Sequence, residues 1–546
     1  MADLTYSAPT SLTRRFRGKR PPALLLLLGW MVTALVAIPL SYMLVKAAGA
    51  DQAVWARLAQ TRLAVLMFNT ISLAAAVTAG TVVVGVSLAW LTERTDLWGR
   101  QVWRWLLAMP LAIPTYIGAI VHLALLRPRG GYLVTFLENL AGRPVGTPSP
   151  FGFLGVTFIL TLFMYPYVYL LSAAAFRRLH AVQEEAARSL GYSLGATLWR
   201  VTLPALRPGI SAGALLVALD ILAEYGTVAL LRYETFSSAI YLQLAGRYDR
   251  SAAAVLSGVL VLLALLILVG EMRIKGKARF YQVNSNWRPA PTLPLRAWQI
   301  PALIGTLAVI FMALIVPMLM LLWWTFQAFN DPGAVASNFQ AGSQGLGTFT
   351  WNSLWSSALA AILAVLLSLP VAFLVVRFPN RWTRLFSRSS QVGYALPGVV
   401  VALSLILVVN RYLPFLYATP LLVVLAYVLR HMPQAVRSSE AAMEQLSPVL
   451  EEASQSLGRS SIRSFFEVSL RVILPGLIAG GALVFLTSLK ELPATLLLRP
   501  AGFDTLAVRV WMWAGEGMYS QAAPAALVLI LAAAGPLYFL LHRKRL

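Results

Sequence analysis

Long apolar stretches, separated by short polar segments, run along nearly the whole chain. A helix that crosses a bilayer needs about 20 mostly apolar residues, and about twelve segments come close to this length or exceed it. The first six lie near residues 23–45, 63–91, 102–126, 152–176, 210–231 and 253–270. The others lie near residues 299–326, 353–376, 391–410, 412–430, 476–498 and 522–541. The pattern predicts an all-α polytopic membrane protein.

The composition supports a membrane protein. Of the 546 residues, 59% are hydrophobic and only 12% are charged, whereas about a quarter of a soluble domain is charged. The chain has no cysteine, which excludes disulfides, thiolate metal sites and cysteine nucleophiles. The apolar stretch from Ala23 follows a basic run and is long enough to span. It therefore predicts a first transmembrane helix and not a cleavable signal peptide.

The net charge of +23 first suggests a nucleic-acid partner. Basic residues also gather in the cytoplasmic loops of membrane proteins. If the N-terminus is cytoplasmic, most of the 44 Lys and Arg fall in cytoplasmic segments, and the reversed topology inverts this bias. The cytoplasmic set includes Arg273, Lys275, Lys277, Arg279, Arg543, Lys544 and Arg545. Orientation thus accounts for the charge, so we expect no nucleic-acid binding and place both termini in the cytoplasm.

The spans divide the chain into four parts. A basic cytoplasmic tail over residues 1–22 precedes a first transmembrane domain over residues 23–270. A cytoplasmic linker over residues 271–298 is charged and rich in proline, as expected of a linker. The second transmembrane domain covers residues 299–546.

The two halves are similar in register, as an internal repeat requires. At an offset of 283 residues, Arg94 aligns with Arg377 and Pro114 with Pro397. At an offset of 267 residues, the pairs include Glu184 and Glu451, Gly191 and Gly458, and Glu224 and Glu491. The difference of 16 residues falls in the exterior segment 127–151, which is longer in the first half. Six spans per repeat give both halves the same orientation, with a pseudo-two-fold axis along the membrane normal and a path between them.

One cytoplasmic loop occurs in both halves. The first copy reads Glu184-Glu185-Ala186-Ala187-Arg188-Ser189-Leu190-Gly191 and continues to Leu203-Pro204. The second reads Glu451-Glu452-Ala453-Ser454-Gln455-Ser456-Leu457-Gly458 and continues to Leu470-Arg471. Glu, Ala, Arg and Leu favour a helix, and the two glycines can adopt the left-handed conformation that ends one. Each loop is predicted to present a short helix to a groove on a partner.

These loops resemble the EAA loop of ATP-binding-cassette importer permeases, which reads Glu-Ala-Ala, three residues, Gly, and later Leu-Pro. The first copy matches at Glu185, Ala186, Ala187, Gly191, Leu203 and Pro204. The second matches at Glu452, Ala453 and Gly458, but has Ser454 and Arg471 in place of Ala and Pro. The resemblance implies that both loops, with Glu184 and Glu451 at their starts, dock a cytoplasmic ATPase. Whether the two loops contribute equally stays open at this point.

The chain itself has no Gly-x-x-x-x-Gly-Lys-Ser/Thr motif for nucleotide phosphates. We therefore expect a transport subunit that is not an enzyme and binds no cofactor. Two separate ATPase subunits would use ATP and Mg²⁺. The resemblance also implies a bacterial inner-membrane location and a periplasmic substrate-binding protein. The fused layout, with residues 490–500 and 502–507, resembles the ferric-iron permeases of this superfamily, so the implied substrate is ferric iron.

Ionisable residues inside predicted spans are costly and suggest function. Asp220 and Glu224 are four residues apart, which predicts that they share one helical face. Lys490 and Glu491 lie in the matching helix of the second half. Two interpretations remain open. These four residues line a translocation path that favours a cation, or Lys490 pairs with Asp220 or Glu224 and holds the halves together.

Other functions are also consistent with a polytopic chain. The solute of the importer could be thiamine, phosphonate or another small molecule. An ion-coupled secondary transporter would need no ATPase, and the paired loops argue against it. No cluster of histidine and carboxylate suggests an integral-membrane enzyme. The histidines, at His122, His180, His431 and His542, lack the spacing of metal ligands, so no metal centre is predicted.

Overall fold

The structure is a computed structural model that describes residues 21–146, 149–179, 181–275, 291–339 and 345–542. Within these ranges every named element is a helix, which confirms the all-α prediction. Residues 1–20 of the predicted tail, residues 276–290 of the predicted linker, His180 and the basic residues 543–545 lie outside the described part.

Nine helices of the described part are long and apolar enough to cross a membrane, or ten if one bent pair counts as a span. Those of the first half are α1 (Ala23–Ala48), α2 (Gln52–Leu58) continuing into α3 (Ala64–Arg94), α7 (Phe153–Arg177), α10 (Leu203–Ala223) and α13 (Arg250–Lys275). Those of the second half are α14 (Gln299–Ile310) continuing into α15 (Val316–Asn330), α17 (Leu346–Arg377), α23 (Leu470–Leu489) and α26 (Tyr519–His542).

The third span of the first half is bent. We expected one helix over residues 102–126, which was wrong. Helix α4 (Arg100–Leu106) and a 3-10 turn (Met109–Ala112) meet α5 (Thr115–Leu126) at 93°. Pro114 immediately precedes α5, and its missing N–H and fixed φ suit a helix start. In the second half, Pro397 likewise separates α18 (Arg381–Gln391) and a 3-10 turn from α19 (Gly398–Tyr412).

The expected spans over residues 391–410 and 412–430 also have wrong bounds. Helix α19 has only 15 residues, and it is followed by α20 (Pro420–Gln445). The second of these is long enough to span, but it contains Arg430, Arg437 and Glu440. Neither helix is both long and apolar enough to pass as a span, and so the described part has fewer such helices than the expected twelve.

The fifth span is broken in both halves. Helix α10 ends at Ala223 and α11 (Gly226–Leu230) follows, whereas we expected one helix over residues 210–231. Helix α23 ends at Leu489 and α24 (Pro493–Leu498) follows, where one helix was expected over residues 476–498. Because α10 ends before Glu224, the prediction that Asp220 and Glu224 share a helical face was wrong.

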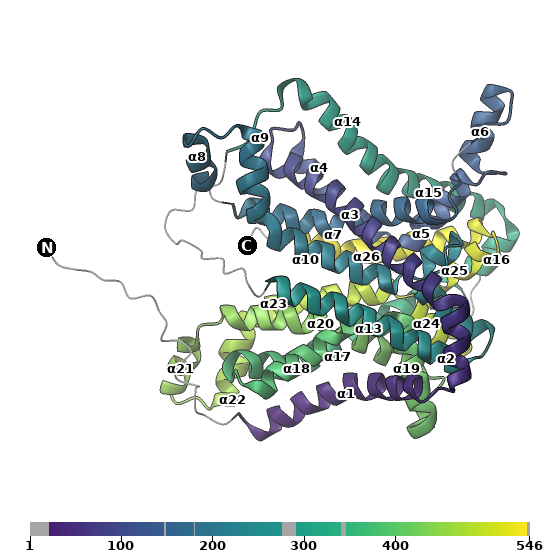
Figure 1. The fold of residues 1–546 in the computed structure, drawn as a ribbon. Helices are drawn as coiled ribbons and strands as arrows, with labels where there is room; N and C mark the ends of the chain where they lie inside the picture. Colours follow the sequence, from purple (N-terminus) through teal and green to yellow (C-terminus); the bar gives the residue numbers. More distant parts are fainter. Residues whose placement is uncertain (1–20, 147–148, 180, 276–290, 340–344, 543–546) are drawn as a thin grey trace.

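The first helix of each half packs on the other half. Helix α1 lies beside α17, α18 and α19, as Figure 1 shows, and Trp30 lies 5.4 Å from Trp382, centroid to centroid. Conversely, α15 packs against α5, and the Trp324 indole donates to the Tyr132 hydroxyl at 3.3 Å. These contacts hold the two halves together, although both helices also pack on their own half, α1 on α13 and α15 on α26.

The two repeated loops lie at one end of the molecule. Helices α8 (Ala181–Ser189), α9 (Leu194–Thr197), α21 (Pro448–Ser456) and α22 (Ser461–Ser464) gather at the left in Figure 1. At the opposite end lie α6 (Tyr132–Ala141), which occupies the longer exterior segment of the first half, and α16 (Pro332–Phe339). The repeat therefore presents both loops on the same face.

Candidate functional site

The two loops have the same backbone path. Helices α8 and α21 begin 267 residues apart, and so do α9 and α22 and the single π-helical turns Leu198–Thr202 and Phe465–Ser469. Gly191 has φ +87° and Gly458 φ +84°, which confirms the predicted left-handed conformation. Arg471 does not change the exit of the second loop, because α23 begins at Leu470 just as α10 begins at Leu203.

A buried arginine holds the first loop on the membrane helices. Arg94, at the end of α3, forms an ion pair through Nη2 with Oε2 of Glu184. The hydroxyl of Thr202 donates to the other oxygen, Oε1, at 2.8 Å. Glu184 therefore faces inward, toward the membrane helices, and leaves Glu185 exposed. We call Arg94, Glu184 and Thr202 the first loop clamp.

The second half repeats this arrangement. Arg377 Nη2 lies 3.3 Å from Glu451 Oε1, and the hydroxyl of Ser469 donates to the same oxygen at 2.8 Å. These residues form the second loop clamp. The sequence interpretation placed Glu184 and Glu451 among the residues that couple the loops to an ATPase, and it gave the arginines no role. The aligned Arg94 and Arg377 were the signal that could have revealed the clamps.

Apolar side chains cover the outer side of both loops at equivalent positions. Leu190 and Leu457 are 80% and 83% exposed. We call the three exposed side chains of each loop its docking face: Val182, Leu190 and Trp199 in the first loop, and Val449, Leu457 and Phe466 at the equivalent positions of the second. Ser454, like its equivalent Ala187, is buried. The departure of the second loop from the EAA pattern at Ser454 therefore lies beneath this face and does not alter it.

The chain between the halves contacts the first loop. The Leu293 N–H donates to the Arg94 carbonyl at 2.7 Å, and the Asp96 N–H donates to the Leu293 carbonyl at 3.2 Å. Leu293 and Pro291 also line a small cavity together with Glu184 and other residues of the first loop. This segment occurs once per chain, so the contact makes the surroundings of the two loops unequal.

Valine at both Gly191 and Gly458 should lower the uptake of substrate per ATP hydrolysed. A side chain in the left-handed region costs about 1–2 kcal/mol per residue. No atom lies within 4 Å of a Cβ built at either glycine, so the expected effect is backbone strain and not a clash. Uptake and ATP hydrolysis in proteoliposomes measure it. The double asparagine variant is the control, because asparagine tolerates this conformation, and equal uptake by all three proteins would contradict the prediction.

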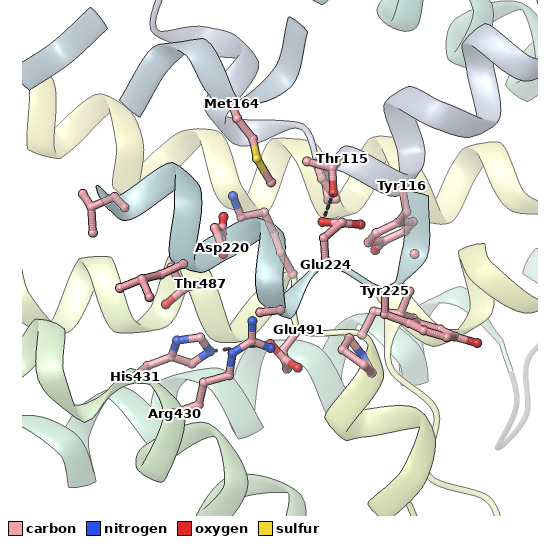
Figure 2. Close-up of a pocket in the computed structure, with 18 of the residues that line it drawn as sticks. Thr115, Tyr116, Met164, Asp220, Glu224, Tyr225, Arg430, His431, Thr487 and Glu491 are labelled. Carbon is pink, nitrogen blue, oxygen red and sulfur yellow. Dashed lines mark hydrogen bonds and ion pairs between the residues drawn. The ribbon is translucent and has the colours of Figure 1, made fainter. Parts of the chain in front are cut away.

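A second site lies between the halves. A cavity of about 180 Å³ is lined by Asp220, Glu224, Lys490 and Glu491, the four residues proposed from the sequence to line a path. Figure 2 shows Asp220, Glu224 and Glu491 around this space. Both halves contribute equivalent positions to its wall, so it lies near the axis that relates them.

Glu224 and Glu491 each lie two residues before the helix that follows a break. Glu224 accepts from the Thr115 hydroxyl at 2.9 Å and from the Thr227 N–H of α11 at 2.8 Å. Glu491 accepts from the Ala494 N–H of α24 at 3.3 Å. Carboxylates stabilise helix N-termini through such hydrogen bonds and through the helix dipole. These two residues therefore stabilise the broken spans as well as lining the cavity.

Two cavity residues were missed from the sequence, Arg430 and His431 of α20. Arg430 Nη1 forms an ion pair with Glu491 Oε2, and His431 Nε2 lies 3.8 Å from the same oxygen (Figure 2). The expected span ended at residue 430 and so placed Arg430 at a membrane boundary. Among the described residues, no group of three or more His, Cys, Asp or Glu could hold a metal ion.

Lys490 does not form the ion pair that one interpretation predicted. Its Nζ donates to the carbonyl of Leu111, at 2.8 Å, in the 3-10 turn of the first half. In the described ranges, Asp220 and Glu224 make no ion pair with it. Lys490 still connects the halves, but through a backbone carbonyl.

The sequence matches the model of a known family twice. That family is the binding-protein-dependent transport system inner membrane component, and the matches cover residues 81–272 and 364–543. The Fe(3+)-transport system permease protein FbpB 2 of Haemophilus influenzae is 33% identical over 526 residues, which cover 96% of this chain and 98% of that protein. The chain belongs to this family.

Two further relatives show how the family unit is used. The ferric transport system permease protein FbpB of Actinobacillus pleuropneumoniae is 23% identical over 433 residues, 78% of this chain and 63% of that protein. The sulfate transport system permease protein CysT of Synechocystis is 27% identical over 279 residues, 49% of this chain and 94% of that protein. The chain is thus an integral inner-membrane permease of the ATP-binding-cassette importers, with two family units fused. Each unit contains one loop clamp and one docking face.

Proposed function

We propose that this chain forms the translocation path of an ATP-driven importer for ferric iron. Two cytoplasmic ATPase subunits bind the two docking faces, and a periplasmic binding protein delivers the substrate at the opposite end. ATP and Mg²⁺ act on the ATPase subunits, and this chain binds no cofactor and catalyses no reaction. The loop end and both termini face the cytoplasm, in line with the distribution of basic residues.

The observation that carries the proposal is the pair of matched loops. Each has an exposed apolar face outside and a buried arginine clamp inside, so a movement of the loop is passed to α3 or α17. A secondary transporter needs no ATPase and therefore needs no pair of loops that bind one. Support for iron comes from the similarity to permeases named for ferric iron, one of them over nearly the full length.

Uptake by the reconstituted complex tests the proposal. The chain is placed in proteoliposomes with its cognate ATPase and binding protein, and radiolabelled ferric iron and sulfate are offered separately. We expect uptake of iron that requires ATP and persists after ion gradients are collapsed. Uptake of sulfate but not of iron would overturn the assignment of ferric iron as the substrate. Uptake that needs an ion gradient and no ATPase would overturn the proposal of an ATP-driven importer.

A further inference from the structure

We propose that Lys490 acts as a tethered cation that keeps small cations out of the translocation path. The inference rests on the proposed function, because it takes the central cavity to be part of that path. Lys490 is then a residue that determines ion selectivity, in addition to connecting the two halves.

The other charges of the cavity have partners. Glu491 forms an ion pair with Arg430, and Glu224 accepts hydrogen bonds from Thr115 and Thr227. For Asp220 the described part of the structure contains no hydrogen bond or ion pair. Asp220 is therefore the carboxylate of this cavity that is available to a passing cation.

Lys490 faces this carboxylate from the other half. Asp220 lies in the last turn of α10, and Lys490 immediately follows α23; both are half-buried and line the same cavity. The hydrogen bond to Leu111 uses one of the three hydrogens of the ammonium group. The two charged groups thus line the same cavity from opposite halves without forming an ion pair, and Arg430 lines it as well. Lys490 thus places a fixed cation where a mobile one would otherwise bind.

A comparison of the two halves distinguishes the charges of Asp220 and Lys490 from the charges that the fold requires. The carboxylates that cap α11 and α24 occur in both halves, as Glu224 and Glu491. The equivalent of Asp220 is Thr487, and the equivalent of Lys490 is Ala223, although all four positions line the cavity. A broken span of this kind therefore forms without either charge. We conclude that the opposed pair Asp220 and Lys490 is specific to the path.

A carboxylate without a partner in this cavity attracts cations. Cations that passed through the cavity would dissipate the membrane potential. The cavity volume of about 180 Å³ has room for several water molecules, and the negative potential inside a bacterium draws cations inward. Some pores, such as those of the aquaporin type, exclude protons and other cations with a fixed positive charge. Transport then requires α23 to move relative to the turn at Leu111. This movement withdraws the ammonium group only when the loops are driven.

Passive ion flux tests this role. The full-length chain is reconstituted in liposomes, and Na⁺ and proton fluxes are recorded under an imposed membrane potential. Lys490→Met should raise both fluxes at least about tenfold, which corresponds to ~1.4 kcal/mol. Lys490→Arg should stay close to the original chain, because the charge is kept. Asp220→Asn combined with Lys490→Met should return both fluxes to those of the original chain, because the carboxylate is removed.

The controls distinguish a selective leak from a packing defect. Chloride flux should not change in Lys490→Met, and a rise equal to that of Na⁺ would overturn the proposal. The proposal would also be overturned if Lys490→Met did not raise the Na⁺ and proton fluxes, or if the raised fluxes persisted in the double variant. If Lys490→Met does not reach the liposomes intact, Lys490→Gln takes its place. ATP-driven iron uptake by the original chain is measured in parallel. A failure there refutes the proposed function, whereas a tight Lys490→Met beside normal uptake refutes only the tethered cation.

Discussion

Replacing Arg94 with glutamine should abolish most ATP-driven uptake while the protein still reaches the membrane. Arg94 is only 3% exposed and pairs with Glu184 at the base of the first loop. Removing one partner of a buried ion pair costs about 3–5 kcal/mol, because the other charge stays buried without compensation. We expect the first loop to detach from α3, so that ATP hydrolysis continues without transport. Uptake and hydrolysis in proteoliposomes measure the loss.

The matched variants give this prediction its control. Arg377→Gln removes the equivalent residue of the second loop clamp, where the ion pair is longer at 3.3 Å, and should have a smaller effect. Arg94→Gln combined with Glu184→Gln leaves no unpaired charge and should recover part of the uptake, as contacting residues do in double-mutant cycles. Equal, additive losses from the two single changes at Arg94 and Glu184 would contradict the clamp.

Aspartate at both Leu190 and Leu457 should prevent the ATPase from binding. Both side chains are about four-fifths exposed, so the substitutions should leave the fold of the permease intact. The few residues that dominate an interface each contribute ~2 kcal/mol or more to binding, and a charge buried there would also lack a partner. Co-purification of the ATPase with detergent-solubilised permease measures the effect.

An exposed leucine at the opposite end provides the control for this change. Leu140, in α6, is 75% exposed and lies far from both loops (Figure 1). Leu140→Asp should leave ATPase binding unchanged. If the double variant retains the ATPase as well as Leu140→Asp does, the docking face is assigned wrongly. Leu190→Asp and Leu457→Asp are also tested singly. If only one of these two variants loses the ATPase, the unequal surroundings created by the segment at Leu293 matter for binding.

Some features follow from local chemistry, and these were predictable. Apolar stretches identified the helices because each must satisfy its own backbone in lipid. The repeat located both loops, and Gly191 and Gly458 took the left-handed conformation that other residues disfavour. Asp220, Glu224, Lys490 and Glu491 were selected from their cost within apolar spans, and all four line one cavity.

Other features depend on which helices meet. Pro114 and Pro397 were visible, but a proline can kink, start or end a helix, so the 93° bend was not predictable from it. Glu224 was expected within a helix because the run of apolar residues continues past the break. The structure breaks there, and Thr115, from a different helix, donates a hydrogen bond to the carboxylate of Glu224, two residues before α11.

The sequence alone thus determined the helical class, the duplication, the position of the two loops and the choice of buried charges. Each of these is a property of neighbouring residues or of a pattern that repeats. The tertiary structure decided that the first helix of each half also packs on the other half, that Arg94 and Arg377 hold the loops, and that Lys490 reaches Leu111. These contacts join residues far apart in the chain. They exist only after the helices pack, since an apolar surface specifies burial but not the partner that buries it.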